Sequence, residues 1–258
     1  MSLQAIILRF DSLPSTNTEA AGQAMRGASE GLCIVAREQT AGRGRHERRW
    51  VSPADAGLYF SIVLRPRFEL RQWPLITLMA ALAVHDALVE ACDLHTDIKW
   101  PNDIYAEDRK LGGILAETLE TETGRAVILG IGLNLSDRVL PHELQASAAS
   151  VEAVTGNRPD TEALLRALVR AVALRYSNLH SPNGAEQTLE EWTKRSSYAE
   201  GKRVRVSVGA EVFEGTTRGL AIDGALRVET DAEEIRTVRA GDVTALRRAS
   251  TKKGMSDE

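Results

Sequence analysis

The spacing of hydrophobic residues along the chain predicts four helices. Apolar residues recur at helical spacing over residues 73–92 and 161–180, and the second segment carries a continuous leucine and valine stripe. A shorter helix is predicted at residues 16–26, where a threonine and a glutamate stand at capping-box spacing and Gly27 follows the end. A fourth helix is predicted at residues 186–197.

Strands are predicted between these helices. Residues 57–64 place Leu58, Phe60 and Ile62 on one face, as a half-buried strand does. The other strands predicted in this region are residues 31–36, 97–105, 110–119 and 124–135. Residues 42–53 show no hydrophobic period and are predicted to form a loop. The mixture of helices and strands indicates an α+β domain over residues 1–197.

The pattern changes after Ser197. Five short apolar runs are separated by glycines, which is typical of a small β-barrel. The predicted strands are residues 204–208, 212–217, 225–229, 234–238 and 243–246. We therefore predict a second, all-β domain over residues 198–248. The polar tail, residues 249–258, is predicted to be disordered.

Composition narrows the class of protein. The chain has 258 residues, of which 43% are hydrophobic and 26% are charged, so it is long enough to bury a large core. Its net charge of -4 disfavours a protein that coats nucleic acid. Cys33 and Cys92 lie in apolar stretches and are predicted to be free thiols. The sequence shows no signal-peptide pattern and no membrane span, so we expect a cytoplasmic protein.

The first candidate for chemistry is Gly42-Arg43-Gly44-Arg45. Glycines let the backbone approach a ligand closely, and arginines present planar donors to phosphate or carboxylate. Because the following residues are also mostly basic, we expect this loop to be mobile when empty and ordered by an anion. A solvated basic loop is the alternative interpretation.

The second candidate is Lys99-Trp100-Pro101-Asn102-Asp103. The proline holds the chain in an extended conformation, and an aspartate there is suited to bind Mg²⁺ beside a nucleotide. An ordinary Asn-Asp turn would give the same pattern.

Two further motifs place glycines inside strands. Lys110-Leu111-Gly112-Gly113 puts an ammonium group where it stabilises charge on a phosphate and a carbonyl oxygen. Gly130-Ile131-Gly132-Leu133-Asn134 predicts close approach of a ligand or of another backbone, and it is not a dinucleotide fingerprint. An exposed hairpin lysine and a bulged core strand are the alternatives.

The order and spacing of these motifs resemble those of the bacterial biotin–protein ligases. The matching pieces are Ser15-Thr16-Asn17, Gln39, Gly42-Arg43-Gly44-Arg45 with Trp50, Lys99-Trp100-Pro101-Asn102-Asp103, Lys110-Leu111-Gly112-Gly113-Ile114-Leu115 and Gly130-Ile131-Gly132-Leu133-Asn134. The β-rich end of the chain matches around Arg218-Gly219 and Gly224-Ala225-Leu226. The resemblance extends from about Phe10 to Arg247.

The resemblance implies a mixed-sheet catalytic domain related to lipoate ligases, followed by an SH3-like barrel. The implied activity is ATP-dependent adenylation of biotin to biotinyl-5′-AMP, followed by transfer of biotin to a lysine of a biotin carboxyl carrier protein. Mg²⁺ is the implied metal, and a monomer or homodimer the implied state.

The resemblance also implies roles for individual residues. The biotin site is expected to contain Ser15, Thr16, Asn17, Gln39, Arg43, Gly44, Arg45, Lys110, Gly112, Gly113 and Gly132. The nucleotide site is expected to contain Arg48, Trp50, Asn102, Asp103 and Asn134, with Asp103 as metal ligand. Arg43, Arg45 and Lys110 are the expected catalytic residues. Residues 136–150 are a second candidate lid, over the adenine.

One position departs from the family pattern. In the family the arginine–glycine run often continues with a further glycine, whereas here it continues His46-Glu47-Arg48-Arg49. We expect Glu47 to stiffen the lid or to alter retention of the adenylate.

Three alternatives have discriminating features. A lipoate ligase shares the adenylation chemistry, but the two motifs at residues 42–45 and 99–103 favour biotin. A DNA-binding repressor needs a helical reader, and Ser15-Thr16-Asn17 leaves no room for one before it. A non-catalytic biotin-binding module needs neither Lys110 nor Asp103.

Overall fold

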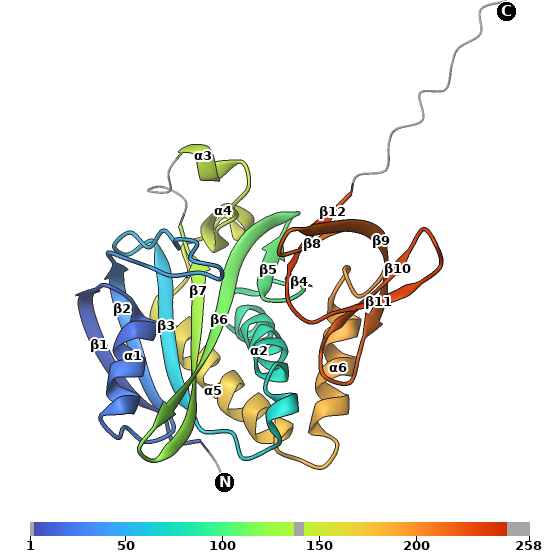
Figure 1. Cartoon of the computed structure of the whole chain (residues 1–258). Coiled ribbons are helices and arrows are strands. Elements are labelled where there is room, and N and C mark those ends of the chain that lie inside the picture. The colour runs from blue at the N-terminus through green and yellow to red at the C-terminus, as the bar shows by residue number, and fades with distance from the viewer. Residues whose placement is uncertain (1–2, 137–141, 247–258) are drawn as a thin grey trace, which may run out of the picture.

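The computed structural model describes residues 3–136 and 142–246 (Figure 1). The first sheet contains β1 (Ile6–Leu13), β2 (Leu32–Gln39), β3 (Gly57–Leu64), β4 (Asp97–Lys99), β5 (Asp103–Ala106), β6 (Arg109–Thr121) and β7 (Gly124–Asn134). Their spatial order is β1-β2-β3-β7-β6-β5-β4. β1 and β2 are parallel and the other neighbours are antiparallel, so the predicted mixed sheet is confirmed.

Helices pack on both faces of this sheet. The helices of the described residues are α1 (Thr16–Met25), the short 3₁₀ helix η1 (Leu70–Gln72), α2 (Leu75–Cys92), α3 (His142–Gln145), α4 (Val151–Thr155), α5 (Thr161–Leu179) and α6 (Gly184–Arg195). α1 buries Ala20 and Ala24 against Ile34 and Val63 on one face. α2 and α5 pack together and fill the larger core on the other face (Figure 1).

α2 is the central helix of that core. It is long and apolar enough to cross a membrane by length and composition alone. Most of its residues are instead buried within the protein, among them Leu75, Met79 and Leu82. Such uniform hydrophobicity is expected of a helix enclosed on several sides. Cys33 and Cys92 are free thiols, as predicted, and burial raises the pKa of Cys33 to about 12.

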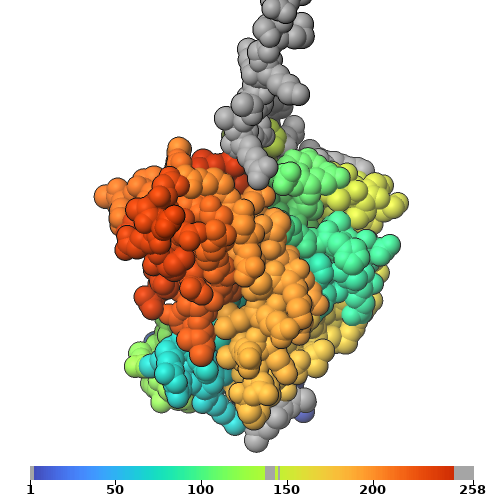
Figure 2. All heavy atoms as spheres, turned by 90° about the vertical axis from the view of Figure 1, so that its right-hand side faces the viewer, coloured from blue at the N-terminus to red at the C-terminus, as the bar shows by residue number. Residues whose placement is uncertain are grey.

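The C-terminal sheet is antiparallel and contains β8 (Glu200–Val208), β9 (Glu211–Leu220), β10 (Leu226–Thr230), β11 (Ile235–Val238) and β12 (Asp242–Ala245), in the order β11-β10-β9-β8-β12. The five strands correspond to the five predicted ones, and the predicted boundary after Ser197 falls between α6 and β8. Trp192 of α6 shares one apolar cluster with Val204 and Leu226 of this sheet. The two parts therefore share one apolar core, and Figure 2 shows the C-terminal part packed against the rest of the molecule.

Several elements differ from the predicted ones. β1 was not predicted, because an edge strand with a mixed burial pattern depends on its parallel pairing with β2 rather than on local sequence. The strand predicted at residues 97–105 is a β4–β5 hairpin, broken at Trp100 and Pro101. The short helices α3 and α4 were not predicted. The predicted disordered tail, residues 249–258, lies outside the described residues.

The core at the junction of the two sheets predicts a stability effect. Trp192 is fully buried, so Trp192→Ala should lower the free energy of unfolding by about 3–5 kcal/mol, through lost burial and the cavity left behind. Urea denaturation measures this change. Leu174→Ala on α5 is the control, because that side chain is 62% exposed and its loss should change little. Equal effects of the two substitutions would contradict this account of the core.

Candidate active site

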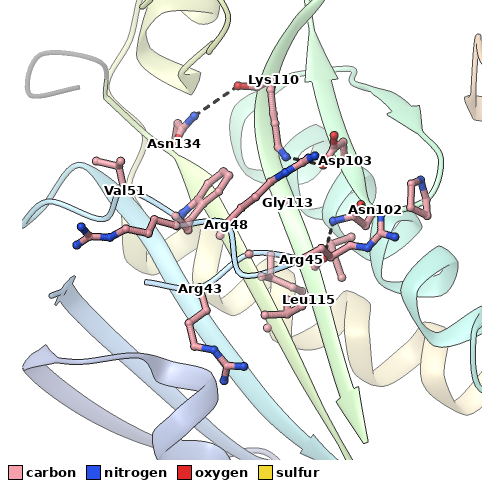
Figure 3. Close-up of a pocket in the computed structure, with 18 of the residues that line it drawn as sticks. Arg43, Arg45, Arg48, Val51, Asn102, Asp103, Lys110, Gly113, Leu115 and Asn134 are labelled. Atoms are coloured by element: carbon pink, nitrogen blue, oxygen red, sulfur yellow. Dashed lines mark hydrogen bonds and ion pairs between the residues drawn. The ribbon is translucent and has the colours of Figure 1, made fainter. Parts of the chain in front are cut away.

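A cavity of about 630 Å³ lies beside the N-terminus of α1, over strands β4 to β7. Its wall is completed by the lid, which we define as residues 42–50, and by residues of the C-terminal sheet. Figure 3 shows that Arg45, Arg48, Asp103 and Lys110 come from three separate stretches of chain and approach one another. The cavity therefore exists only in the folded protein, where these stretches are brought together.

Nearly all residues expected at the site line this cavity. They are Ser15, Thr16, Asn17, Gln39, Arg43, Gly44, Arg45, Arg48, Trp50, Asn102, Asp103, Lys110, Gly113, Gly132 and Asn134. Gly112 is not among the lining residues. A Cβ atom there would lie 2.5 Å from Leu133 Cδ2 and 2.8 Å from the Gly132 carbonyl oxygen. Gly112 therefore allows β6 and β7 to pack closely.

A polar network forms the wall at the α1 end of the cavity. The Gln39 Oε1 atom accepts hydrogen bonds from the Thr16 amide at 2.8 Å and from the Thr16 hydroxyl at 3.1 Å. The Ser61 hydroxyl lies 2.6 Å from Asn17 Oδ1. Ser61 is fully buried on β3, and its position in an apolar run gave no signal of this role. Because these side chains are bonded to one another, the wall is held rigidly.

Two glycines of β7 form the floor. A Cβ atom on Gly130 would lie 2.1 Å from Asn17 Oδ1, and one on Gly132 would lie 2.6 Å from Trp50 Nε1. Side chains at these positions would displace Asn17 and Trp50 from the strand. In the described part of the chain, Trp50 Nε1 is a buried donor without a hydrogen-bond partner. An unpaired buried donor costs free energy, so this indole is a candidate contact for an acceptor atom of a ligand.

The lid is a tight hairpin. The Trp50 amide donates to the Gly42 carbonyl at 2.9 Å, and the Gly44 amide donates to the Arg48 carbonyl at 2.7 Å. At its tip, His46 and Glu47 have φ values of 51° and 59°, as a type I′ turn requires. Each non-glycine residue in this region costs roughly 1 kcal/mol. Glu47 therefore stands where the backbone favours glycine.

Three of the four lid arginines attach the lid to other parts of the protein. Arg43 forms an ion pair with Glu117 of β6 at 2.6 Å. Arg45 donates to Asn102 Oδ1 and to the Gly241 carbonyl, both at 3.2 Å. Burial lowers the pKa of Arg45, and the charges of nearby aspartates oppose this shift.

The third arginine connects the lid to the C-terminal sheet. Arg48 forms an ion pair with Asp242 of β12. Ser207, Val243 and Thr244 of the same sheet also line the cavity. These contributions were not predicted, because isolated polar residues in short strands carry no distinguishing motif.

Lys110 of β6 lines the cavity beside Asp103. Its Nζ atom is 2.6 Å from Asp103 Oδ1, and these side chains are 35% and 18% exposed (Figure 3). Nζ also lies 5.6 Å from the Trp50 ring centroid. The Lys110 backbone pairs with Ser147 and Ala149, which holds the segment after α3 against the site. Leu144, Ser147 and Ala148 line the cavity, whereas residues 137–141 of the predicted second lid lie outside the described residues.

This arrangement is suited to bring two anions together. Arginine, lysine and carboxylate side chains alternate around one partly enclosed space, where charge interactions are stronger than in water. A polar, rigid wall at one end can bind an uncharged part of a ligand. The geometry fits the joining of a carboxylate to a nucleotide phosphate.

Comparison with known proteins gives the same family over most of the chain. The family model described as "Biotin/lipoate A/B protein ligase family" matches residues 9–134, and "Biotin protein ligase C terminal domain" matches residues 201–244. The chain is 35% identical over 244 residues to the "Bifunctional ligase/repressor BirA" of Bacillus subtilis, covering 92% of this chain and 73% of that protein. It is 34% identical over 239 residues to the "Biotin--[acetyl-CoA-carboxylase] ligase" of Mycobacterium tuberculosis, covering 90% and 86%.

The fold is also similar to that of a solved enzyme. The structure titled "Biotin protein ligase from Aquifex aeolicus in complex with biotin and ATP" superposes with a TM-score of 0.81 at 27% identity, covering 94% of this chain and 99% of that one. The site geometry, both family models and these relatives agree, and this chain belongs to the biotin protein ligase family.

Proposed function

We propose that this cavity activates biotin with ATP to give biotinyl-5′-AMP and then transfers biotin to a lysine of a carboxylase carrier domain. The observation that carries this proposal is the convergence of Arg43, Arg45, Lys110 and Asp103 on one cavity. The family supports the ligase reaction, and the Aquifex aeolicus relative binds biotin and ATP. The roles of individual residues below are our inferences.

The first half-reaction joins two anions. A biotin carboxylate oxygen attacks the α-phosphorus of ATP, a new O–P bond forms, and pyrophosphate leaves with the electron pair of the broken bond. Lys110 lies centrally enough to contact both the carboxylate and the α-phosphate. Arg43 and Arg45 add positive charge from the lid, so the repulsion between the reactants is reduced before they meet.

Biotin itself is assigned to the α1 end of the cavity. Its ureido group needs hydrogen-bond partners, and its hydrocarbon parts need apolar walls. Ser15, Thr16, Asn17 and Gln39 supply polar groups at that end, and Gly130 and Gly132 leave room above β7.

The nucleotide is assigned to the opposite part of the cavity. Asn102, Asp103 and Asn134 line it there, together with Arg48 and Trp50 of the lid. The described residues contain no group of three or more metal-ligating side chains. Mg²⁺ usually binds through one or two carboxylates, substrate phosphates and water, so Asp103 alone fits a metal carried by ATP. When bound there, Mg²⁺ supplies charge neutralisation on the phosphates.

The lid is assigned a protective role. Biotinyl-5′-AMP is a mixed anhydride that water destroys, so the cavity must stay closed until an amine arrives. The contacts of Arg43, Arg45 and Arg48 with three different elements hold the lid in this closed position. The amine nucleophile comes from the acceptor, so no covalent enzyme intermediate is needed.

The partner is inferred from the family. We infer that the acceptor is a biotin carboxyl carrier protein, because the Mycobacterium tuberculosis relative is named as an acetyl-CoA-carboxylase ligase. We also infer a cytoplasmic enzyme that works as a monomer or homodimer, and the two free thiols agree with a reducing compartment.

Replacement of the central lysine should abolish activation while leaving the fold intact. Lys110→Ala removes the cation between carboxylate and phosphate, so the rate of biotin-dependent pyrophosphate release should fall by roughly a hundredfold to a thousandfold. Arg109→Ala is a matched control, because Arg109 is the preceding basic residue but pairs outward with Glu107. A near-normal rate of biotinyl-AMP formation by the Lys110→Ala protein would show that Lys110 is misassigned.

Loss of a lid cation should release the intermediate. Arg45→Gly removes the contacts with Asn102 and the Gly241 carbonyl, so biotinyl-5′-AMP should escape faster. Non-specific biotin labelling of bystander proteins measures this escape and should rise by about tenfold for a charged hydrogen bond. Unchanged labelling, with adenylation still active, would remove the lid role from Arg45.

A substitution at the tip of the lid should slow the escape of biotinyl-5′-AMP, whereas loss of Arg45 should speed it. Glu47→Gly places glycine at a left-handed position and should favour the closed turn by roughly 0.5 kcal/mol, so escape of the adenylate should slow about twofold. Glu47→Ala also removes the carboxylate but keeps the Cβ atom. If both variants slow escape equally, the charge of Glu47 is responsible and the backbone argument is wrong.

A further inference from the structure

Three of the six basic side chains that line the cavity form an ion pair with a neighbouring carboxylate. Lys110 pairs with Asp103, Arg43 with Glu117 and Arg48 with Asp242. Lys99 lines the same cavity, but no carboxylate of the described residues lies within ion-pair distance of it. Its Nζ atom makes one hydrogen bond, to the Tyr105 hydroxyl at 3.1 Å. Lys99 therefore has no carboxylate in direct contact among the described residues, although the charges of Asp103 and Asp242 act on it from farther away.

Strand pairing places Lys99 on the reacting face of the sheet. Lys99 of β4 lies opposite Asp103 of β5, and Tyr105 of β5 lies opposite Lys110 of β6. Directly opposed residues of antiparallel strands point to the same face, and residues two apart on one strand do so as well. The alternate residues Ile98 and Ile104 are buried in the core on the other face. Lys99, Asp103, Tyr105 and Lys110 therefore form one polar row across three strands.

Aromatic rings hold the Lys99 side chain in place. Its Nζ atom lies 4.9 Å from the Tyr105 ring centroid and 5.7 Å from that of Tyr198. Burial lowers the pKa of Lys99, while the charges of Asp103 and Asp242 oppose the shift. An ammonium group has three N–H donors, so an anion in the cavity can take those that Tyr105 does not use.

The chemistry of adenylation indicates which anion this is. In displacement at phosphorus, the attacking and leaving oxygens lie roughly in line. The biotin end of the cavity is at α1, over β3 and β7, and Lys110 on β6 lies at the reacting centre. The leaving pyrophosphate must then lie on the far side of Lys110, toward β5 and β4. Lys99 is on β4.

We propose that Lys99 binds the β- and γ-phosphates of ATP and retains contact with them as they leave as pyrophosphate, while Tyr105 positions its side chain. This inference rests on the proposed function, because it assumes that biotin occupies the α1 end. It gives Lys99 a role different from that of Lys110, which faces the bond that forms.

The affinities for AMP and for α,β-methylene-ATP distinguish the proposed role of Lys99 from that of Lys110. AMP lacks the two outer phosphates, whereas α,β-methylene-ATP keeps them and cannot be cleaved. Lys99→Met should weaken binding of α,β-methylene-ATP by about tenfold to a hundredfold, as expected for loss of a charge-assisted hydrogen bond, and should leave binding of AMP nearly unchanged. Calorimetric titrations with and without biotin measure both affinities. Equal weakening for the two nucleotides, or no weakening for either, would overturn the proposal.

The chain offers a matched control. Lys202 lies 4.9 Å from the Tyr198 ring centroid but does not line the cavity, so Lys202→Met loses the same charge beside the same ring. It should leave binding of both nucleotides unchanged. Lys99→Arg should recover part of the lost affinity for α,β-methylene-ATP. If Lys202→Met weakens that nucleotide as much as Lys99→Met does, general charge loss explains the effect and the proposal fails.

A kinetic measurement distinguishes this inference from the proposed function. Biotin-dependent exchange of labelled pyrophosphate into ATP should show a raised KM for pyrophosphate in Lys99→Met. Absence of this exchange in the unaltered protein would contradict the proposed function itself. Exchange that is active in both proteins with the same KM for pyrophosphate would contradict only the role of Lys99.

Discussion

Repulsion between a carboxylate and a triphosphate is the constraint around which this structure is organised. Cations that relieve it must stand close together before the substrates arrive, and they repel one another in an empty cavity. The protein meets this difficulty by pairing three of them with carboxylates, as in the contact of Lys110 with Asp103. The cationic side chains are then already in position when the phosphates of the ligand bind, so little reorganisation is needed during the reaction.

The sheet makes this arrangement possible at low conformational cost. One face of β4 to β7 buries apolar side chains against α2, which fixes the strands. The other face is then free to present polar residues in register, and Gly130 and Gly132 keep it open beside α1 and the lid. The C-terminal sheet contributes Asp242 and the Gly241 carbonyl, so it anchors the lid as well as covering one end of the cavity.

Local sequence predicted the elements whose signals are local. The long helices, the central strands and the five C-terminal strands follow from periodicity, and motifs identified the cavity residues from Ser15 to Asn134. What could not be predicted depends on contacts distant in sequence. β1 exists through its pairing with β2, and Ser61 and Asp242 acquire their roles only because α1 and the lid are brought onto them.

Gly112 and Lys99 show why a motif does not by itself assign a role to each of its members. Both stand inside motifs shared with the family, yet Gly112 serves strand packing and Lys99 lines the cavity without a carboxylate partner. Strand alternation explains both outcomes. Gly112 of β6 is buried against Leu133 of β7, whereas Lys99 shares a face with Asp103 across the β4–β5 hairpin. A cation at the reacting face without a carboxylate in direct contact is where the phosphates of the substrate complete the site.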